Sequence, residues 1–522
     1  MIREISRRKC LRLWLCKPEY MERTKWENRF VLLRFWKKNY MMFLKDLKRF
    51  KMERLYDKLK AYSESDFYAF HMPGHKRNKA LLGIELPYDL DITEIDGFDD
   101  LHHADGILKE EQERAARVFG AEESHFLVNG STAGILSAVM GCTHRGDKIL
   151  VARHCHKSIY HAIYMNGLVP RYVYPEFDIS MHMNGEISKE DVAKALAAEP
   201  DIKAVVIVSP NYDGVVSDVK GIAEVAHSYR IPLIVDEAHG PHFGFHPAFP
   251  GRANDLGADV VINSLHKTLP SLTQTAILHI NGKLANRRRI KKYLDMLQSS
   301  SPSYIFMASL DACVDFLDGK CEEAFELYVE RLQKFREELK PLQHLQILRT
   351  EHYDISKVVI STANANITSP ELADRLRKEY HLEMEMTGGT YVLAMTTVAD
   401  TQEGLDRLKA ALLEIDGQLE AKTAVSGSIE ISGELPRLEQ YFTPQEAADR
   451  EEDGEAEEIP WKESEGHISL EYAYLYPPGS PVIVPGERIS REAVELLCYY
   501  ETQNLQIEGI QTEGKIKVWK HE

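Results

Sequence analysis

The stretch VVINSLHK, residues 260–267, decides how this chain folds, because an apolar run ends there in a polar segment that carries a lysine. An earlier stretch, PLIVDEAHG at residues 232–240, has the same form, and its apolar run ends at Asp236. Short apolar runs bounded by polar turns are typical of strands buried in a parallel sheet. The pattern therefore predicts two buried strands that present Asp236 and Lys267 at their carboxyl ends.

A carboxylate and a lysine delivered in this way are the groups that pyridoxal phosphate requires. The lysine amine forms a Schiff base with the cofactor aldehyde, and the carboxylate keeps the pyridine nitrogen protonated, so that the ring accepts electrons. Asp236 by itself could instead be a metal ligand or the partner of a nucleotide ribose. Together with Lys267 it predicts an enzyme that uses pyridoxal phosphate.

From about residue 80 the chain alternates segments of strand and helix character, which indicates an α/β fold with a parallel sheet covered on both faces. The predicted strands are residues 125–128, 148–151, 204–208, 232–235, 258–262 and 274–280. A cluster of polar residues follows most of them. Because ligands bind at the carboxyl ends of the strands in open α/β sheets, we expect five loops to assemble one site there.

Several loop residues suit a cofactor with a phosphate group. Residues 130–133 (GSTA) open a predicted helix, where backbone N–H groups and the helix dipole favour a dianion. Ser264 and His266 flank the lysine and could add donors. His156 could stack on the pyridine ring, or it could simply cap a helix by bonding to the backbone. The phosphate-loop signatures of nucleotide-binding proteins are absent from the sequence.

Metal chemistry is the main alternative, because histidines gather in two clusters: His154, His156 and His161, and His239, His242 and His246. Their spacing matches neither HExxH nor a paired-cysteine pattern, so we expect no metal site.

Composition limits the other possibilities. A chain of 522 residues is expected to form more than one domain. Its net charge of −17 argues against nucleic acid or a membrane as the main partner. Seven cysteines without a CxxC pair indicate a reducing cytoplasm rather than a disulfide framework.

Two charged segments stand apart. Residues 1–51 hold 16 Lys and Arg against 5 Asp and Glu, and they could form a basic arm that contacts RNA or membrane. We favour a dispensable extension, with the working protein beginning near Met52 and an amphipathic helix from residue 53. The acidic stretch at residues 449–458 is predicted to be a solvated loop.

The SLHK stretch, with Gln274 downstream, resembles the pyridoxal-lysine motif of the Orn/Lys/Arg decarboxylases, enzymes of the aspartate-aminotransferase fold (fold type I). The resemblance extends over almost all of the chain after Met52 and is to the short bacterial biosynthetic form, which lacks the wing domain. Further similar motifs follow in the family's order at residues 70–76, 91–94, 119–121, 156–158, 212–214, 236–240, 476–479 and 485–487.

The resemblance implies a role for individual residues. Lys267 would carry the cofactor, Asp236 would face its ring nitrogen, and His156 would stack on the ring. The phosphate would be held by Ser131, Thr132, Ala133, Ser264 and His266. His239 would also line the cofactor site, although relatives often have tryptophan there.

Two further residues concern the substrate and the assembly. Glu385 resembles an acid that contacts the distal cation of the substrate. Ser299 resembles a residue whose loop reaches the cofactor of a neighbouring subunit, which implies a homodimer, or a dimer of dimers, with shared active sites.

The expected activity is decarboxylation of a basic amino acid for polyamine synthesis, with arginine to agmatine first, lysine to cadaverine second and ornithine third. An aminotransferase of the same fold is the alternative. Such enzymes generally hold the α-carboxylate with an arginine of the small domain, but residues 390–395 contain none. A metal-dependent hydrolase or a non-catalytic cofactor-binding protein is less favoured.

The expected architecture has four parts after the basic extension. An N-terminal segment covers residues 52–80, and the cofactor domain covers residues 81–335. A small α/β domain covers residues 336–425, and a C-terminal α+β domain covers residues 426–522.

Overall fold

The computed structural model describes residues 54–81, 83–179, 181–422, 434–475, 479–503 and 505–520. The chain divides into two compact units, residues 1–58 and 59–522. The predicted basic arm at residues 1–51 lies outside the described residues, so it stays a prediction. No described helix is both long enough and apolar enough to cross a bilayer.

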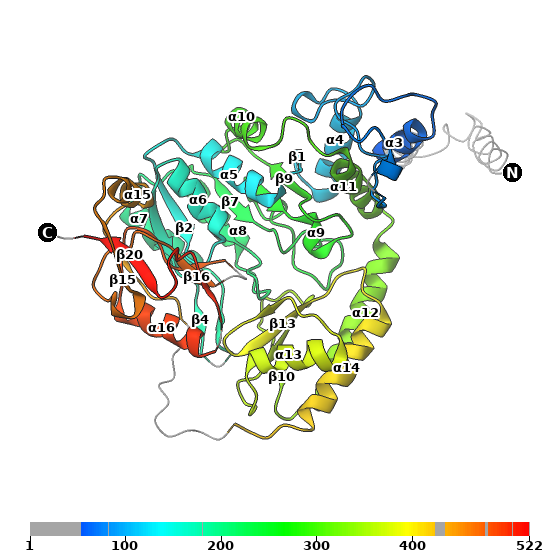
Figure 1. Cartoon of the computed structure of the whole chain (residues 1–522). Helices are drawn as coiled ribbons and strands as arrows, with labels where there is room; N and C mark the ends of the chain where they lie inside the picture. Colours follow the sequence, from blue (N-terminus) through cyan, green and yellow to red (C-terminus); the bar gives the residue numbers. More distant parts are fainter. Residues whose placement is uncertain are drawn as a thin grey trace, which may run out of the picture. The chain divides into compact units, whose positions relative to one another are not determined.

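A seven-stranded sheet lies at the centre of the second unit, and Figure 1 shows it in cyan and green. Six of its strands run in the same direction, and β9 runs antiparallel to both of its neighbours, β1 and β8. This arrangement confirms the predicted, mostly parallel sheet. In spatial order the strands are β1 (Glu123–Leu127), β9 (Ala276–Ile280), β8 (Val260–Asn263), β7 (Leu233–Asp236), β6 (Val205–Val208), β2 (Lys148–Ala152) and β3 (Val169–Val173).

Helices cover this sheet. They are α4 (Ile107–Phe119), α5 (Gly130–Cys142), α6 (Lys157–Met165), α7 (Lys189–Ala198), α8 (Val219–Ser228), α10 (Arg287–Leu297) and α11 (Tyr304–Leu317), together with the single turn α9 (Leu265–Thr268). Helix α5 packs against α10 so closely that a Cβ atom at Gly141 would lie 2.8 Å from the backbone nitrogen of Ile290. That close approach requires glycine at position 141.

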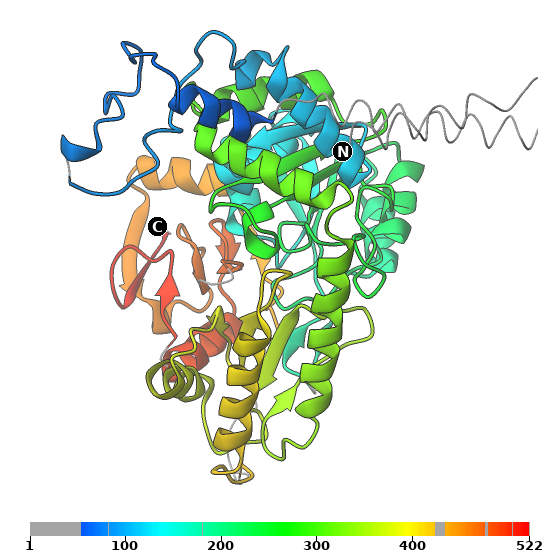
Figure 2. The same cartoon turned by 90° about the vertical axis from the view of Figure 1, so that its right-hand side faces the viewer.

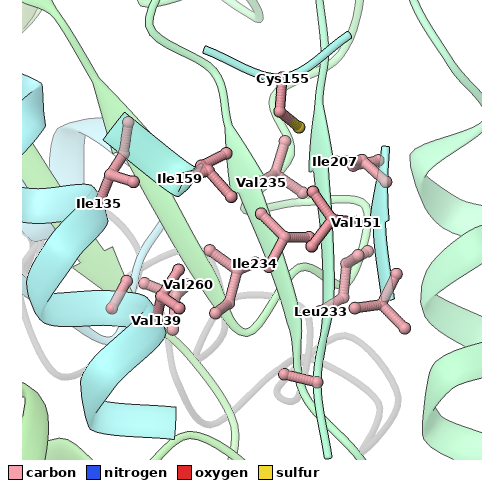
Figure 3. Close-up of a cluster of buried hydrophobic side chains, with 14 of the residues drawn as sticks. Ile135, Val139, Val151, Cys155, Ile159, Ile207, Leu233, Ile234, Val235 and Val260 are labelled. Atoms are coloured by element: carbon pink, nitrogen blue, oxygen red, sulfur yellow. The ribbon is translucent and has the colours of Figure 1, made fainter. Parts of the chain in front are cut away.

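The core lies between these helices and the sheet. Figure 3 shows Ile135 and Val139 of α5 and Ile159 of α6 facing strand residues such as Val235 and Val260. Each of these side chains is at most 2% exposed, and burial of one such side chain stabilises the fold by roughly 1.5–3 kcal/mol. Because helices cover both faces, the central strands are continuously apolar, and their polar residues occur only where a strand ends.

The next part of the chain forms a smaller layer in which every strand pair is antiparallel. Its sheet has the order β10 (Gln346–Ile347), β11 (Lys357–Ser361), β13 (Tyr391–Met395) and β12 (Met386–Thr387). Its helices are α12 (Glu322–Glu338), α13 (Ser369–Tyr380) and α14 (Gln402–Asp416). Figure 2 shows α12 and α14 side by side along this sheet.

The C-terminal part packs on the large sheet through a buried ion pair. Arg153, which directly follows β2, donates from Nη2 to Glu487 Oε2 at 3.0 Å, and both side chains are at most 1% exposed. The same guanidinium donates to the carbonyl oxygens of Pro481 and Val482. The elements of this part are β14 (Glu439–Gln440), α15 (Pro444–Glu452), β15 (Ala456–Pro460), β16 (Ala473–Leu475), β17 (Pro481–Ile483), β18 (Glu487–Arg488), α16 (Arg491–Thr502), β19 (Ile507–Glu508) and β20 (Lys515–Trp519).

The prediction of a solvated loop at residues 449–458 is wrong. This acidic stretch forms the end of α15 and the start of β15. Thr443 and Glu446 form a capping box that fixes the start of α15. Strand β15 pairs with β20, which brings Lys517 Nζ to 2.6 Å from Glu451 Oε1. Basic partners supplied by a distant strand therefore allow a run of acids to fold.

The short elements that remain are the helix α3 (Leu55–Ser63), the hairpin strands β4 (Phe177–Asp178) and β5 (Met183–Asn184), and the 3-10 turns η2 (Lys79–Leu81), η3 (Leu101–His103) and η4 (Trp461–Glu463). The predicted helix from residue 53 thus begins two residues later, at Leu55.

Candidate active site

Lys267 lies where strand β8 ends and the single turn α9 begins, with Ser264 as the N-cap residue. Its Nζ is 2.8 Å from Nε2 of His239. Burial lowers the pKa of Lys267 below its usual value, although Asp236 and Glu385 act in the opposite direction. A lysine whose pKa is lowered by burial is more often neutral, and a neutral amine is the nucleophilic form.

Asp236 is the last residue of β7, the strand next to β8, and is 3% exposed. One carboxylate oxygen accepts the backbone N–H of Ala238 at 3.1 Å. Burial raises the pKa of Asp236, and the charge of Lys267 opposes that rise. The two strand ends therefore bring an acid and an amine into the same buried environment, as the sequence predicts.

His239 completes the surroundings of the amine. Burial and the nearby charge of Lys267 lower its pKa well below the usual value, so the ring is neutral at pH 7. A neutral imidazole nitrogen can accept a hydrogen bond from the Lys267 amine. The opposite ring nitrogen, Nδ1, is buried and has no hydrogen-bond partner among the described residues.

His156 is the N-cap residue of α6, where its Nδ1 accepts the backbone N–H of Ser158 at 3.2 Å. This is the helix-capping contact that the sequence offered as the alternative to ring stacking. Burial, with a contribution from Lys267, lowers the pKa of His156 to about 4. His156 thus lies within the electrostatic reach of Lys267, and its stacking role stays a prediction.

A group with a phosphate fits the residues beside Lys267. The Ser264 hydroxyl is fully buried without a hydrogen-bond partner in the described part of the chain. His266 donates from Nδ1 to the carbonyl of Thr275 at 2.9 Å, which leaves Nε2 for another partner. Gln274 donates to the carbonyl of Val128 at 2.6 Å and so joins this segment to the end of β1.

The loop that opens α5 lies at the same edge of the sheet. Gly130 has a φ of +73°, a conformation that side chains disfavour, and the helix begins there. Ser131 is half-buried, Thr132 is exposed and Ala133 is buried. A helix of 13 residues that starts with free N–H groups can bind an anion.

Ser299 is exposed and lies beside this loop. Its backbone N–H donates to Oδ1 of Asn129 at 3.3 Å, and its carbonyl accepts from Nε2 of His102 at 2.8 Å. Its predicted contact with a second subunit stays a prediction.

Glu385 directly precedes β12 and is exposed. It accepts a hydrogen bond from the hydroxyl of Tyr212, whose ring centroid is 4.5 Å from that of His239. The contacts therefore run from Lys267 through His239 and Tyr212 to Glu385. An acid at the far end of this series suits the distal cation of a substrate attached near Lys267.

Sequence reasoning missed a buried charge network beneath the lysine. Lys357 is 0% exposed, and its Nζ donates to the carbonyl of His239 and to Oδ2 of Asp354, each at 3.4 Å. Asp354 also lies 3.1 Å from His242, whose other ring nitrogen contacts the Thr268 hydroxyl. The signal in the sequence is Lys357 itself, a charged residue that opens an otherwise apolar strand.

No group of three His, Cys, Asp or Glu side chains within the described ranges is arranged to hold a metal ion.

Comparison with known proteins places these features in one family. Residues 53–413 match the model of the Orn/Lys/Arg decarboxylase major domain, and residues 433–514 match that of the C-terminal domain. The arginine decarboxylase of Bacillus subtilis is 34% identical over 471 residues, which cover 87% of this chain and 95% of the relative. The lysine decarboxylase LdcA of Pseudomonas aeruginosa is 25% identical over 83% of this chain and 73% of the relative.

Solved structures agree on the fold. The constitutive lysine decarboxylase of Escherichia coli superposes with a TM-score of 0.76 at 21% identity, covering 89% of this chain and 82% of the other. The Francisella novicida lysine decarboxylase LdcF also gives a TM-score of 0.76, at 20% identity, covering 92% of this chain and 84% of the other. These superpositions confirm the predicted fold class, and the family and sequence matches confirm the predicted decarboxylase class. The chain belongs to the Orn/Lys/Arg decarboxylase family.

Proposed function

We propose that this chain decarboxylates arginine to agmatine with pyridoxal phosphate bound at Lys267. The observation that carries the proposal is the Lys267 amine, held 2.8 Å from neutral His239 and within the field of buried Asp236. When bound, pyridoxal phosphate supplies a ring that takes up the electron pair of the breaking bond between Cα and the carboxylate.

Each residue has a distinct task in this proposal. Lys267 binds the cofactor aldehyde, and Asp236 supplies the negative charge that keeps a ring nitrogen protonated. His156 covers the ring. Ser264, His266 and the start of α5, with Ser131, Thr132 and Ala133, bind the phosphate. Lys267 Nζ and His239 Nε2, 2.8 Å apart, can hold one proton between them and deliver it to the substrate carbon.

The choice of arginine rests on the relatives and on Glu385. Four Bacillus and Halalkalibacterium relatives named arginine decarboxylase are 32–34% identical to this chain, whereas relatives named lysine decarboxylase are 23–25% identical. The exposed carboxylate of Glu385 suits any distal cation, so lysine is the second choice and ornithine the third. The amine product would enter polyamine synthesis in the cytoplasm.

The proposed assembly is a homodimer or a dimer of dimers with shared active sites. Two features of the chain support it. The Ser299 segment is exposed beside the phosphate loop. Several large apolar side chains in the motif at residues 70–76, or just before it, are also exposed. They include Phe67 at 69%, Phe70 at 90% and Met72 at 64%. Exposed apolar clusters of this kind are typical of surfaces that another chain covers.

The test measures carbon dioxide and amine release by purified protein supplied with pyridoxal phosphate and, separately, with arginine, lysine or ornithine. We expect the highest kcat/KM with arginine and agmatine as the product. A higher kcat/KM with lysine would overturn the substrate assignment alone. Release of a keto acid without carbon dioxide would replace decarboxylation by amino-group transfer.

A further inference from the structure

A cavity is lined in part by Tyr212, the residue that contacts both His239 and Glu385. Its walls come from three parts of the chain: the β4–β5 hairpin and the segment after β6, the β12–β13 turn, and the C-terminal elements α16, β16 and β17. Tyr212 lines this cavity, but Lys267, Asp236, His156 and His239 do not. Tyr212 is therefore a wall that the cavity shares with the candidate active site.

Unpaired polar atoms belong to the lining of this cavity. His154 is 7% exposed, and its Nδ1 has no hydrogen-bond partner within the described residues. Burial lowers the pKa of His154 to about 4, so the ring is neutral and can accept a hydrogen bond. The side-chain oxygens of Asn184 and Thr390 are buried and unpaired in the same part of the structure. Buried polar atoms without partners are rare, and several around one cavity indicate a ligand that satisfies them.

The charge in the cavity is negative. Asp213 is 7% exposed and receives a hydrogen bond from the Tyr391 hydroxyl. Burial raises its pKa to about 6, so the carboxylate is mostly ionised at pH 7. Among the described residues, no Lys or Arg side chain forms an ion pair with it. A buried carboxylate that lacks a cationic partner favours a ligand that brings the cation.

The rest of the lining suits an organic cation. Tyr391, Tyr499 and Tyr500 contribute aromatic rings, and Met183 and Met386 contribute flexible apolar walls. Aromatic faces attract alkylammonium groups, and thioether side chains adapt to methylene chains. A metal ion would instead require a group of three or more His, Cys, Asp or Glu ligands, and the described part of the chain has no such group.

We propose that this cavity is a second binding site, separate from Lys267, for a protonated alkylamine of the diamine class. One ammonium group would contact the carboxylate of Asp213 and the amide oxygen of Asn184, while the methylene chain would lie among the tyrosines and methionines. Because Tyr212 lines the cavity and donates to Glu385, an amine bound there can alter the hydrogen bond that orients Glu385.

The test is titration calorimetry of the full-length protein with 1,4-diaminobutane after incubation with pyridoxal phosphate and borohydride. This treatment fixes bound cofactor on its lysine as a secondary amine, so the diamine cannot react with it. We expect one diamine bound per chain. The measurement needs no turnover, and protein without cofactor can be titrated in the same way, so failure of the proposed activity would leave this result readable.

Three variants locate the bound amine. Asp213→Asn and Asn184→Leu should each weaken binding about tenfold or more, since each removes a hydrogen bond to a charged group. Asn184→Leu removes the amide group whose buried oxygen is unpaired, and the melting temperatures of both variants, compared with the wild type, separate lost binding from a folding defect. Glu385→Gln should change the affinity for the diamine much less than the two cavity variants do, because Glu385 is coupled to the cavity only through Tyr212. No binding to the wild type would overturn the proposal, as would binding that Glu385→Gln abolishes and the cavity variants leave intact.

Discussion

The chain buries an acid and a base in each of two regions, but only one of these pairs is in direct contact. Arg153 and Glu487 form a direct ion pair at 3.0 Å, and additional backbone carbonyls bind the guanidinium. Lys267 and Asp236 influence each other electrostatically but form no direct ion pair in the described residues; the lysine amine contacts neutral His239 instead. The first region joins two parts of the fold, whereas the second keeps its charged groups available.

The pKa shifts of the two cations differ in direction, whereas burial raises the pKa of both acids, Glu487 and Asp236. Although burial opposes its charge, Glu487 holds the pKa of Arg153 above its usual value. Burial lowers the pKa of Lys267 despite nearby Asp236. The Arg153 guanidinium therefore stays charged, but an amine that loses its proton easily can react. The predictions below test whether this contrast separates structure from catalysis.

The largest expected effect is on turnover. Lys267→Ala should reduce kcat/KM by a factor on the order of 10³ or more, because it removes the nucleophile that binds the cofactor. Lys283→Ala, which changes an exposed lysine, serves as the control and should retain full activity. Steady-state assays of carbon dioxide release decide this, and equal losses in both variants would contradict it.

The second effect is on stability. Glu487→Gln leaves the Arg153 guanidinium buried without its counter-ion and should lower the free energy of unfolding by about 3–5 kcal/mol. Asp236→Asn removes a carboxylate whose pKa is raised in the folded state, and the destabilisation by such a group is complete once the pH exceeds that pKa. That destabilisation begins as the pH rises above the unfolded value of 3.8, so in cofactor-free protein at pH 7 Asp236→Asn should unfold at higher denaturant concentration than the wild type. Denaturant titration of both variants compares the two regions directly. A Glu487→Gln variant more stable than the wild type would contradict a stabilising role for the Arg153–Glu487 pair.

A smaller effect concerns substrate affinity. Glu385→Gln should raise KM for arginine about tenfold or more and change kcat much less, because the acid contacts only the distal cation. Glu383→Gln, an exposed acid two residues earlier, is the matched control. A Glu385→Gln variant with normal KM and reduced kcat would assign this acid to the chemical step.

The smallest effect is a shift in pH dependence. A folded-state pKa below the usual lysine value of 10.5 means that Lys267 loses its proton earlier as the pH rises. The rate at which cofactor-free protein takes up pyridoxal phosphate should therefore rise with pH and level off below pH 10.5. Stopped-flow absorbance measures this rate. A rate that continues to rise through pH 10.5 would show that burial does not lower the pKa of Lys267.

The sequence was sufficient to predict six of the seven central strands and the positions of Asp236 and Lys267, whereas β3 was missed. A strand covered on both faces is apolar throughout, so its end is visible as the first polar residue. The sequence was not sufficient to predict that the acidic residues 449–458 form parts of a helix and a strand, because their cationic partner Lys517 comes from a strand far along the chain. Lys357 was missed for the same reason, since only tertiary contacts bring it to His239.

The domain boundaries predicted from the sequence are consistent with the separate sheets of the structure. Both these boundaries and the predicted roles of the site residues stay predictions. The motif at residues 476–479 falls mostly outside the described residues, because only its last residue is described. The role of Tyr212 in linking His239 to Glu385 could not be predicted either, because two loops from different sheets must meet before the contact exists.

The central claim is that Lys267 is the side chain that binds pyridoxal phosphate covalently. Protein incubated with the cofactor, treated with borohydride and digested can be examined by peptide mass spectrometry. We expect the mass of the reduced pyridoxal phosphate adduct to appear on Lys267, the lysine beside His239. Attachment at buried Lys357 or at another lysine, with Lys267 unmodified, would contradict it.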